Sequence, residues 1–172
     1  MLVLCAVGVD SLHGKEWLVV SLDKVFGAKV VEGLPLVAID DACDQGRGQY
    51  LAGGILAKLA VSNLERGAKV LGVAEVDLYA PGLNFVFGQA DARLGTAVIS
   101  LCRLRQEFYG LPADDQLFRD RALKEAVHEI GHTFGLGHCP DDGCVMRFSN
   151  CLADTDFKSA NFCAGCRPKL LV

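Results

Sequence analysis

The sequence predicts a mixed α/β fold in which a largely parallel sheet carries one antiparallel strand. Three observations lead to this prediction. Apolar runs of strand length alternate with helical patterns over the first half of the chain, two later strand-like runs are joined by a short connection, and one long helix precedes an irregular, cysteine-rich tail. Alternating strands and helices are typical of parallel sheets, whereas a short connection favours an antiparallel pair.

The chain is predicted to begin with a strand and a helix. Residues 2–9 form an apolar run of strand length. Residues 10–27 carry apolar side chains at roughly helical spacing. We expect Asp10 or Ser11 to cap this helix and Gly27 to end it.

A second strand, a loop, a second helix and a third strand are predicted next. Residues 28–33 are a short strand candidate, and residues 33–48, rich in aspartate and glycine, are expected to form a connecting loop. Residues 49–67 have a helical pattern, and residues 68–82 an apolar strand pattern that ends in Pro-Gly. The first three strands therefore alternate with helices and are predicted to be parallel.

The second half of the chain is predicted to hold two strands and one long helix. Residues 83–91 and 96–104 are strand-like and separated by only a few residues, which favours an antiparallel connection. We expect the first of these two strands to be the antiparallel edge. Residues 116–134 are predicted to form a long helix, and the chain after Gly135 has little regular pattern.

The composition is typical of a globular protein without a nucleic-acid or membrane partner. Of the 172 residues, 51% are hydrophobic and 22% are charged, and the net charge is −4. No apolar run reaches the ~20 residues needed to span a bilayer. The apolar start lacks a basic flank and ends at Asp10, so we expect a buried strand, not a signal peptide, and a cytoplasmic protein.

Two histidines and a glutamate form the pattern H-E-x-x-H on the long predicted helix. His128 and His132 are four residues apart, so their imidazoles share one helix face. That spacing lets two ring nitrogens meet one zinc ion at ~2.0–2.1 Å. Glu129 can lie beside the metal and take the proton of a zinc-bound water, as in metallopeptidases. A match of five residues alone also occurs by chance on ordinary helices.

A third histidine makes this pattern far more specific. If the helix continued, His138 would be rotated about 240° from His132, away from the metal. Gly135 lies where a left-handed residue is needed to end the helix and turn the chain. Three imidazoles leave a fourth position open for water, which is typical of a catalytic zinc site. The remaining histidine, His13, has no such neighbours and is expected at the surface.

Four of the eight cysteines form two closely spaced pairs in the tail. Four residues separate Cys139 from Cys144, and two separate Cys163 from Cys166. Two such pairs about twenty residues apart are typical of a closed, structural four-thiolate zinc site. Metal-free thiols and a disulfide are the alternatives, the latter disfavoured in a reducing compartment. Cys151, between the pairs, is a competing ligand with poorer spacing.

The adjacent residues His138 and Cys139 indicate two separate metal ions. Neighbouring side chains diverge, so the imidazole is expected to face the open site and the thiolate the closed one. The sequence therefore predicts two zinc ions per chain, one catalytic and one structural.

These motifs together resemble the archaemetzincin family. The segment HEIGHTFGLGH fits H-E-x-x-H-x-x-G-x-x-H, the metzincin signature, and Met146 falls where that clan has its methionine turn. The cysteine pattern that ends in CAGC adds to the likeness. The upstream segments VDLYAPGLNFVFGQAD and VISLCRL also look like strands of that family, so the resemblance covers most of the chain.

The resemblance implies a single metzincin-like catalytic domain over residues 1–172. Residues 1–137 would be an N-terminal subdomain with a five-stranded, mixed, twisted sheet, one antiparallel edge strand and the active-site helix. Residues 138–172 would be a small subdomain with the structural zinc. The implied site consists of Glu129 as general base, of His128, His132 and His138 on the catalytic zinc, of Cys139, Cys144, Cys163 and Cys166 on the structural zinc, and of Met146 in the turn.

The resemblance also implies where a substrate binds. The edge strand near residues 84–88 would border the cleft, where an extended peptide adds as a further strand. One position departs from some metzincin branches, which have a tyrosine two residues after the turn methionine, whereas this chain has Phe148. Without that hydroxyl, the oxyanion is stabilised by zinc alone or by another group. Arg147 is a candidate, with an ordinary surface role as the alternative.

The sequence thus predicts a zinc-dependent metallopeptidase that hydrolyses peptide bonds by Glu129-assisted attack of a zinc-bound water. Two alternatives stay open at this point. One is a zinc-binding module or regulator whose site is too occluded for peptides. The other is a zinc hydrolase that acts on a non-peptide amide.

Overall fold

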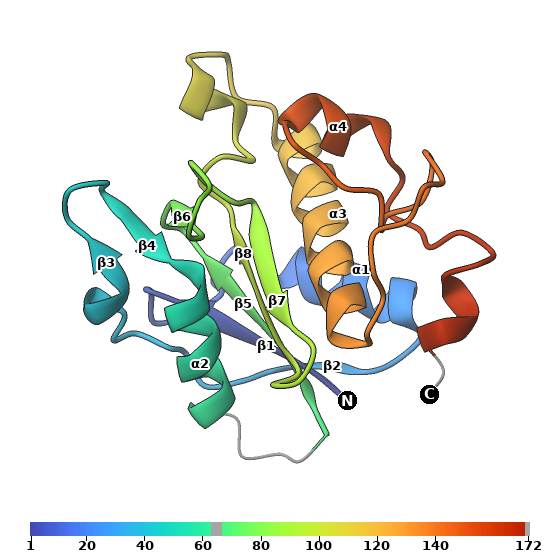
Figure 1. The fold of residues 1–172 in the computed structure, drawn as a ribbon, viewed down its shortest axis with the longest axis horizontal. Helices are drawn as coiled ribbons and strands as arrows, with labels where there is room; N and C mark the ends of the chain where they lie inside the picture. The colour runs from blue at the N-terminus through green and yellow to red at the C-terminus, as the bar shows by residue number, and fades with distance from the viewer. Residues whose placement is uncertain (63–66, 171–172) are drawn as a thin grey trace.

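The computed structural model describes residues 1–62 and 67–170, which form a sheet with helices on both faces (Figure 1). The sheet has five strands in the order β2-β1-β5-β8-β7. Four strands are parallel, and β7 pairs antiparallel with β8 at one edge. The strands are β1 (Leu2–Val7), β2 (Val30–Glu32), β5 (Lys69–Ala74), β7 (Gly88–Asp91) and β8 (Thr96–Ser100). The predicted mixed α/β fold with an antiparallel edge strand is confirmed.

Alternate residues of β1 contribute to two separate cores, one on each face of the sheet. Leu2 and Leu4 pack in the core with helices α1 (Glu16–Phe26) and α3 (Asp115–Thr133). Val3 and Val7 pack in the other core with α2 (Ala52–Ser62). Successive strand side chains point to opposite faces, so a strand covered on both sides reads as a continuous apolar run.

A second, three-stranded sheet was not predicted from the sequence. It consists of β3 (Cys43–Asp44), β4 (Gln49–Leu51) and β6 (Leu78–Tyr79), in that order. The expected single strand over 68–82 is therefore two strands in two sheets. The expected loop over 33–48 contains β3 and a 3-10 turn, η1 (Asp40–Ala42).

The same sheet moves the start of the second helix. The expected helix over 49–67 begins at Ala52, because residues before it belong to β4, and its last expected turn at 63–66 lies outside the described residues. The Tyr50 N–H donates to the Asp77 carbonyl (2.9 Å), a pairing between distant segments that local periodicity does not report.

Helix α1 starts later than expected and ends where expected. Gly14 has a φ of +76°, a backbone conformation outside the right-handed helical region. The helix therefore begins at Glu16, and neither Asp10 nor Ser11 caps it. Gly27, with a φ of +62°, ends the helix as predicted.

The tail packs along α3 and shares its core. Helix α3 agrees closely with the predicted 116–134, and the Asp114 Oδ1 accepts a hydrogen bond from the Leu117 N–H (2.9 Å) at its start. After α3 the chain forms α4 (Leu152–Phe157) and the 3-10 turn η3 (Arg167–Leu170), and another such turn, η2 (Gln106–Tyr109), precedes α3. Figure 1 shows the tail that follows α3, coloured orange to red, lying over that helix. Within the described ranges, no helix combines the length and apolarity needed to cross a bilayer.

Candidate active site

The end of α3 turns the chain back toward the helix, as the glycine pattern predicted. Gly135 has a φ of +84°, a left-handed conformation that a side chain disfavours. Its N–H donates to the His132 carbonyl (2.9 Å), and the Leu136 N–H donates to the Gly131 carbonyl (3.3 Å). These bonds satisfy the last helix carbonyls and carry His138 back toward the helix face that bears the other two histidines.

The structure gathers the three predicted imidazoles into one cluster. Ring nitrogens of His128, His132 and His138 all lie within 4.8 Å of one another. The Nε2 atoms of His128 and His132 are 3.0 Å apart. Two nitrogen ligands of one tetrahedral zinc ion lie about 3.3 Å apart, so the cluster fits such an ion.

Backbone carbonyls fix the orientation of two of these rings. His128 Nδ1 donates to the Val145 carbonyl (2.8 Å), and His132 Nδ1 donates to the Leu136 carbonyl (2.7 Å). A carbonyl oxygen can only accept, so Nδ1 carries the proton and the Nε2 lone pair faces the cluster. Burial lowers the pKa of all three imidazoles, that of His128 to about 2, so they are held in the neutral form that binds metals.

Glu129 lies beside the imidazoles, buried against the edge strand. A Cβ atom added at Gly88 on β7 would lie 2.6 Å from the Glu129 Cγ, so only a glycine leaves room for this carboxylate. Burial raises the Glu129 pKa well above its usual range; the nearby Glu125 raises it further and Lys158 lowers it. Gly88 was not singled out from the sequence, although a glycine within a strand pattern is itself a signal of close approach.

Met146, predicted to form the methionine turn, packs against the active-site helix. It is fully buried, and its sulfur and methyl group pack against Gly131, one residue before His132 on α3. A side chain at Gly131 would overlap Met146 and crowd the ring of Phe162. The turn and the helix are therefore in direct contact.

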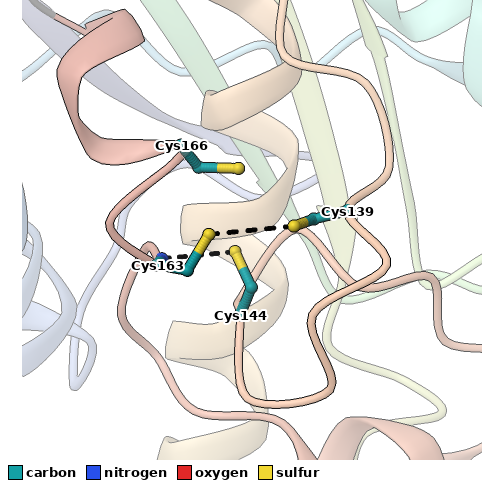
Figure 2. A group of neighbouring side chains, drawn as sticks. All are labelled: Cys139, Cys144, Cys163 and Cys166. Atoms are coloured by element: carbon teal, nitrogen blue, oxygen red, sulfur yellow. Dashed lines mark hydrogen bonds between the residues drawn. The ribbon is translucent and has the colours of Figure 1, made fainter.

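The four cysteines predicted to bind the second ion also come together (Figure 2). The sulfurs of Cys139 and Cys144, from one loop, face those of Cys163 and Cys166, from another, all within 4.8 Å. The Cys139 and Cys163 sulfurs are 3.8 Å apart, which matches the roughly 3.8 Å between two thiolates on a tetrahedral zinc. Cys151 lies outside this cluster, where its exposed thiol contacts Asp154.

Backbone N–H groups favour the thiolate form of Cys163, whereas burial raises the pKa of Cys144 and Cys166. The pKa of Cys163 falls to about 7, chiefly because the Cys166 N–H faces its sulfur. The Cys163 N–H in turn contacts the Cys144 sulfur at 3.4 Å. A thiolate is the form of cysteine that binds metal.

Two short connections join the cysteine cluster to the imidazole cluster. His138 and Cys139 are neighbours in the chain, and the Cys139 N–H donates to the Met146 carbonyl (3.0 Å). Cys144 directly precedes Val145, whose carbonyl holds the His128 ring. The two clusters are thus joined at two places, His138–Cys139 and Cys144–Val145, and each junction is one peptide unit long.

The imidazoles and Glu129 lie in a cleft of about 750 Å³. One wall is β7 and the segment before it, residues 80–87, which we call the rim segment. The opposite wall is formed by α3 and by residues 135–138 and 148–150. Phe148 lies half-exposed at this wall, with its ring 4.9 Å from that of His138.

The rim segment is held by side chains of Arg47, in the turn between β3 and β4, and of Gln49 on β4. Arg47 Nη2 donates to the carbonyls of Leu83 (3.0 Å) and Asn84 (2.8 Å), and Gln49 Nε2 donates to that of Asn84 (3.0 Å). The guanidinium of Arg147, considered as an oxyanion partner, instead pairs with Asp142. His13 is exposed, as expected.

Comparisons with known proteins agree with this geometry. The family model described as Peptidase family M54 matches residues 34–171. An archaemetzincin of Pyrococcus furiosus is 51% identical over 145 residues, which cover 84% of this chain and 76% of that protein.

Two solved structures are also similar. A zinc-dependent peptidase from Methanocorpusculum labreanum is 33% identical, with a TM-score of 0.89 over 99% of this chain and 100% of that one. An archaemetzincin from Archaeoglobus fulgidus complexed with malonate is 39% identical, with a TM-score of 0.82 over 98% of this chain and 99% of that one.

Proposed function

The chain belongs to peptidase family M54, the archaemetzincins, and from this premise we propose how its residues act in a zinc metallopeptidase. Zinc-dependent hydrolysis of peptides is the activity that the family supports. A binding module without activity, or a hydrolase of non-peptide amides, is not favoured.

We propose that the chain binds two zinc ions. His128, His132 and His138 hold the catalytic ion, because one ring nitrogen of each converges on one point and a fourth position faces the cleft. The second ion is structural and is held by the four clustered cysteines, Cys139, Cys144, Cys163 and Cys166. Four thiolates close that site to substrate and water.

Glu129 is the general base in this proposal. When bound, zinc supplies Lewis-acid activation of a water molecule and of the scissile carbonyl. The positive charge of the bound ion would counter the burial that raises the Glu129 pKa, so the Glu129 carboxylate would accept the proton of the attacking water and deliver it to the leaving amine. Its burial against Gly88 holds the carboxylate in one place beside the imidazoles and keeps bulk water away.

The peptide substrate binds along the open edge of β7. The Phe87 carbonyl accepts from the Ser100 N–H of β8 (2.8 Å), so the backbone groups of Phe87 face the sheet. Backbone groups alternate along a strand, and those of Gly88 and Ala90 therefore face the unpaired edge. An extended peptide can pair with them while its scissile bond lies over the imidazole cluster.

Residues 1–172 act as one catalytic domain, since buried residues of the tail share the core of α1 and α3. The net charge of −4 supports the absence of a nucleic-acid partner. A cytoplasmic location suits the cysteine cluster, because reducing conditions keep thiols available for metal.

One observation carries the proposal: three neutral imidazoles converge beside a buried carboxylate in a cleft. The decisive variant is Glu129→Gln, which keeps the shape of the site and removes the base. We expect zinc content to stay at the wild-type value while turnover of a peptide library falls by about 10²- to 10⁴-fold. Glu107→Gln, at an exposed glutamate on η2, is the matched control. Equal turnover in wild type and Glu129→Gln would exclude this role.

A further inference from the structure

Lys158 is a completely buried lysine that the proposed mechanism leaves unexplained. It directly follows α4, and its ammonium group lies 3.0 Å from Glu125 Oε1 and donates to the Arg147 carbonyl at 3.3 Å. Removing an ammonium from water is unfavourable by several kcal/mol, and an apolar side chain of similar size is often as stable in such a place. Stability alone therefore does not explain a lysine here.

Its carboxylate partner belongs to the active-site helix. Glu125 is buried, lines the cleft, and lies one helical turn before Glu129 and three residues before His128. Its Oε1 also accepts a hydrogen bond from the Thr155 hydroxyl (3.2 Å) on α4. The tail is thus fixed to α3 at the turn that leads into the H-E-x-x-H motif.

The second partner of Lys158 belongs to the methionine turn. Arg147 directly follows Met146, and the Val145 carbonyl in the same turn orients the His128 ring at 2.8 Å. The Lys158 ammonium consequently contacts both sides of the interface between α3 and the turn. A change in the spacing of these two elements would move the His128 ring relative to Glu129.

We propose that Lys158 is a positioning residue of the catalytic centre. Its ammonium joins Glu125 on α3 to the Arg147 carbonyl, and through that link it fixes the Val145 carbonyl and the His128 ring beside Glu129. This role rests on the proposed function of the histidines and Glu129. Neighbours that orient metal ligands typically contribute about 10- to 100-fold to metal affinity or activity.

A double-mutant cycle separates this role from a purely structural one. Lys158→Met leaves Glu125 buried and unpaired, so it is expected to lower the melting temperature. Adding Glu125→Gln removes that unpaired charge and should restore most of the stability. The ammonium that joins the helix to the turn is still missing in the double variant. We expect its kcat to remain about 10- to 100-fold below that of Glu125→Gln alone, with a similar KM.

Lys124→Met is the matched control, because Lys124 also donates to a tail carbonyl, that of Asp156 (3.0 Å), but from the surface. It should leave kcat unchanged. If the double variant recovers kcat together with its melting temperature, Lys158 is structural and the proposal is wrong. The double variant also decides the question if Lys158→Met fails to fold.

Zinc retention provides a readout that does not depend on peptidase activity. Titration with a chelator should remove one zinc ion from the double variant about 10- to 100-fold more readily than from Glu125→Gln. The reactivity of the tail thiols should not change, since the cysteine cluster is untouched. A wild type that cleaves no peptide would refute the proposed function, whereas unchanged zinc retention in the double variant would refute the role of Lys158.

Discussion

Replacing one cysteine of the structural cluster should weaken the catalytic zinc as well. The variant Cys166→Ser is the most informative, because Cys166 is far along the chain from the histidines and has no direct contact with them. Its loss opens the four-thiolate cluster and releases the loop that carries Cys139 and Cys144. His138 adjoins the first of these cysteines, and the Val145 carbonyl, which orients His128, adjoins the second.

The size of the effect follows from the number of ligands that lose support. His138 loses the fixed position of its chain neighbour Cys139, and His128 loses the fixed position of its carbonyl partner, Val145, which adjoins Cys144. Each such contact typically contributes about 10- to 100-fold to metal affinity. The two losses share one loop and are not additive, so we expect a drop of about 100-fold, which corresponds to about 2.7 kcal/mol.

The assay is a zinc count followed by chelator competition on purified protein. The wild type should hold two zinc ions per chain, and Cys166→Ser should hold one or none, with the remaining ion lost at lower chelator concentration. Cys139→Ser should behave in the same way. Cys151→Ser, outside the cluster, is the control and should match the wild type. If Cys166→Ser loses one ion but retains the other with wild-type affinity and peptidase rate, the two sites are independent.

Three further predictions concern the cleft and its histidines. Gly88→Ala places a methyl group against Glu129, so kcat should fall by about 10²-fold in a folded protein, while Gly53→Ala, at an open position, should not change it. Arg47→Ala removes two hydrogen bonds to the rim segment, and steady-state kinetics should show a several-fold higher KM with kcat nearly unchanged. Equal KM values in the variant and the wild type would contradict this role of Arg47. His128 has a lowered pKa when folded, so the unfolded chain binds more protons as the pH falls below about 6.5. Zinc-free protein should therefore melt at lower temperature at about pH 5 than at about pH 7, and His128→Gln should reduce that difference.

The parts of the site that the sequence predicted are those that depend on local spacing. His128 and His132 share a helix face, and Gly135 turns the chain so that His138 follows. All the information lies within eleven residues, and the structure gathers these rings as expected. The cysteine pairs are similar, because each pair lies on a short loop whose two sulfurs point toward a common centre.

The parts that were missed depend on contacts between distant segments. Lys158 and Glu125 meet across 33 positions of the chain, and neither residue is unusual in its local pattern. The small sheet, with its link from Arg47 to the rim segment, joins residues 36 and 37 positions apart. Short strands of two or three residues carry almost no periodicity, so only the folded chain reveals them.

The link between the two metal clusters bears on the synthesis of the protein. The whole H-E-x-x-H-x-x-G-x-x-H segment is synthesised before Cys163 and Cys166, and at ordinary elongation rates the delay is about one to several seconds. During that interval the loop that follows His138, with Cys139 and Cys144, is not yet held by a complete four-thiolate site. A nascent chain would therefore carry every catalytic residue while binding the catalytic ion about 100-fold more weakly, and hydrolysis would reach its full rate only when the last two thiols have closed around their ion.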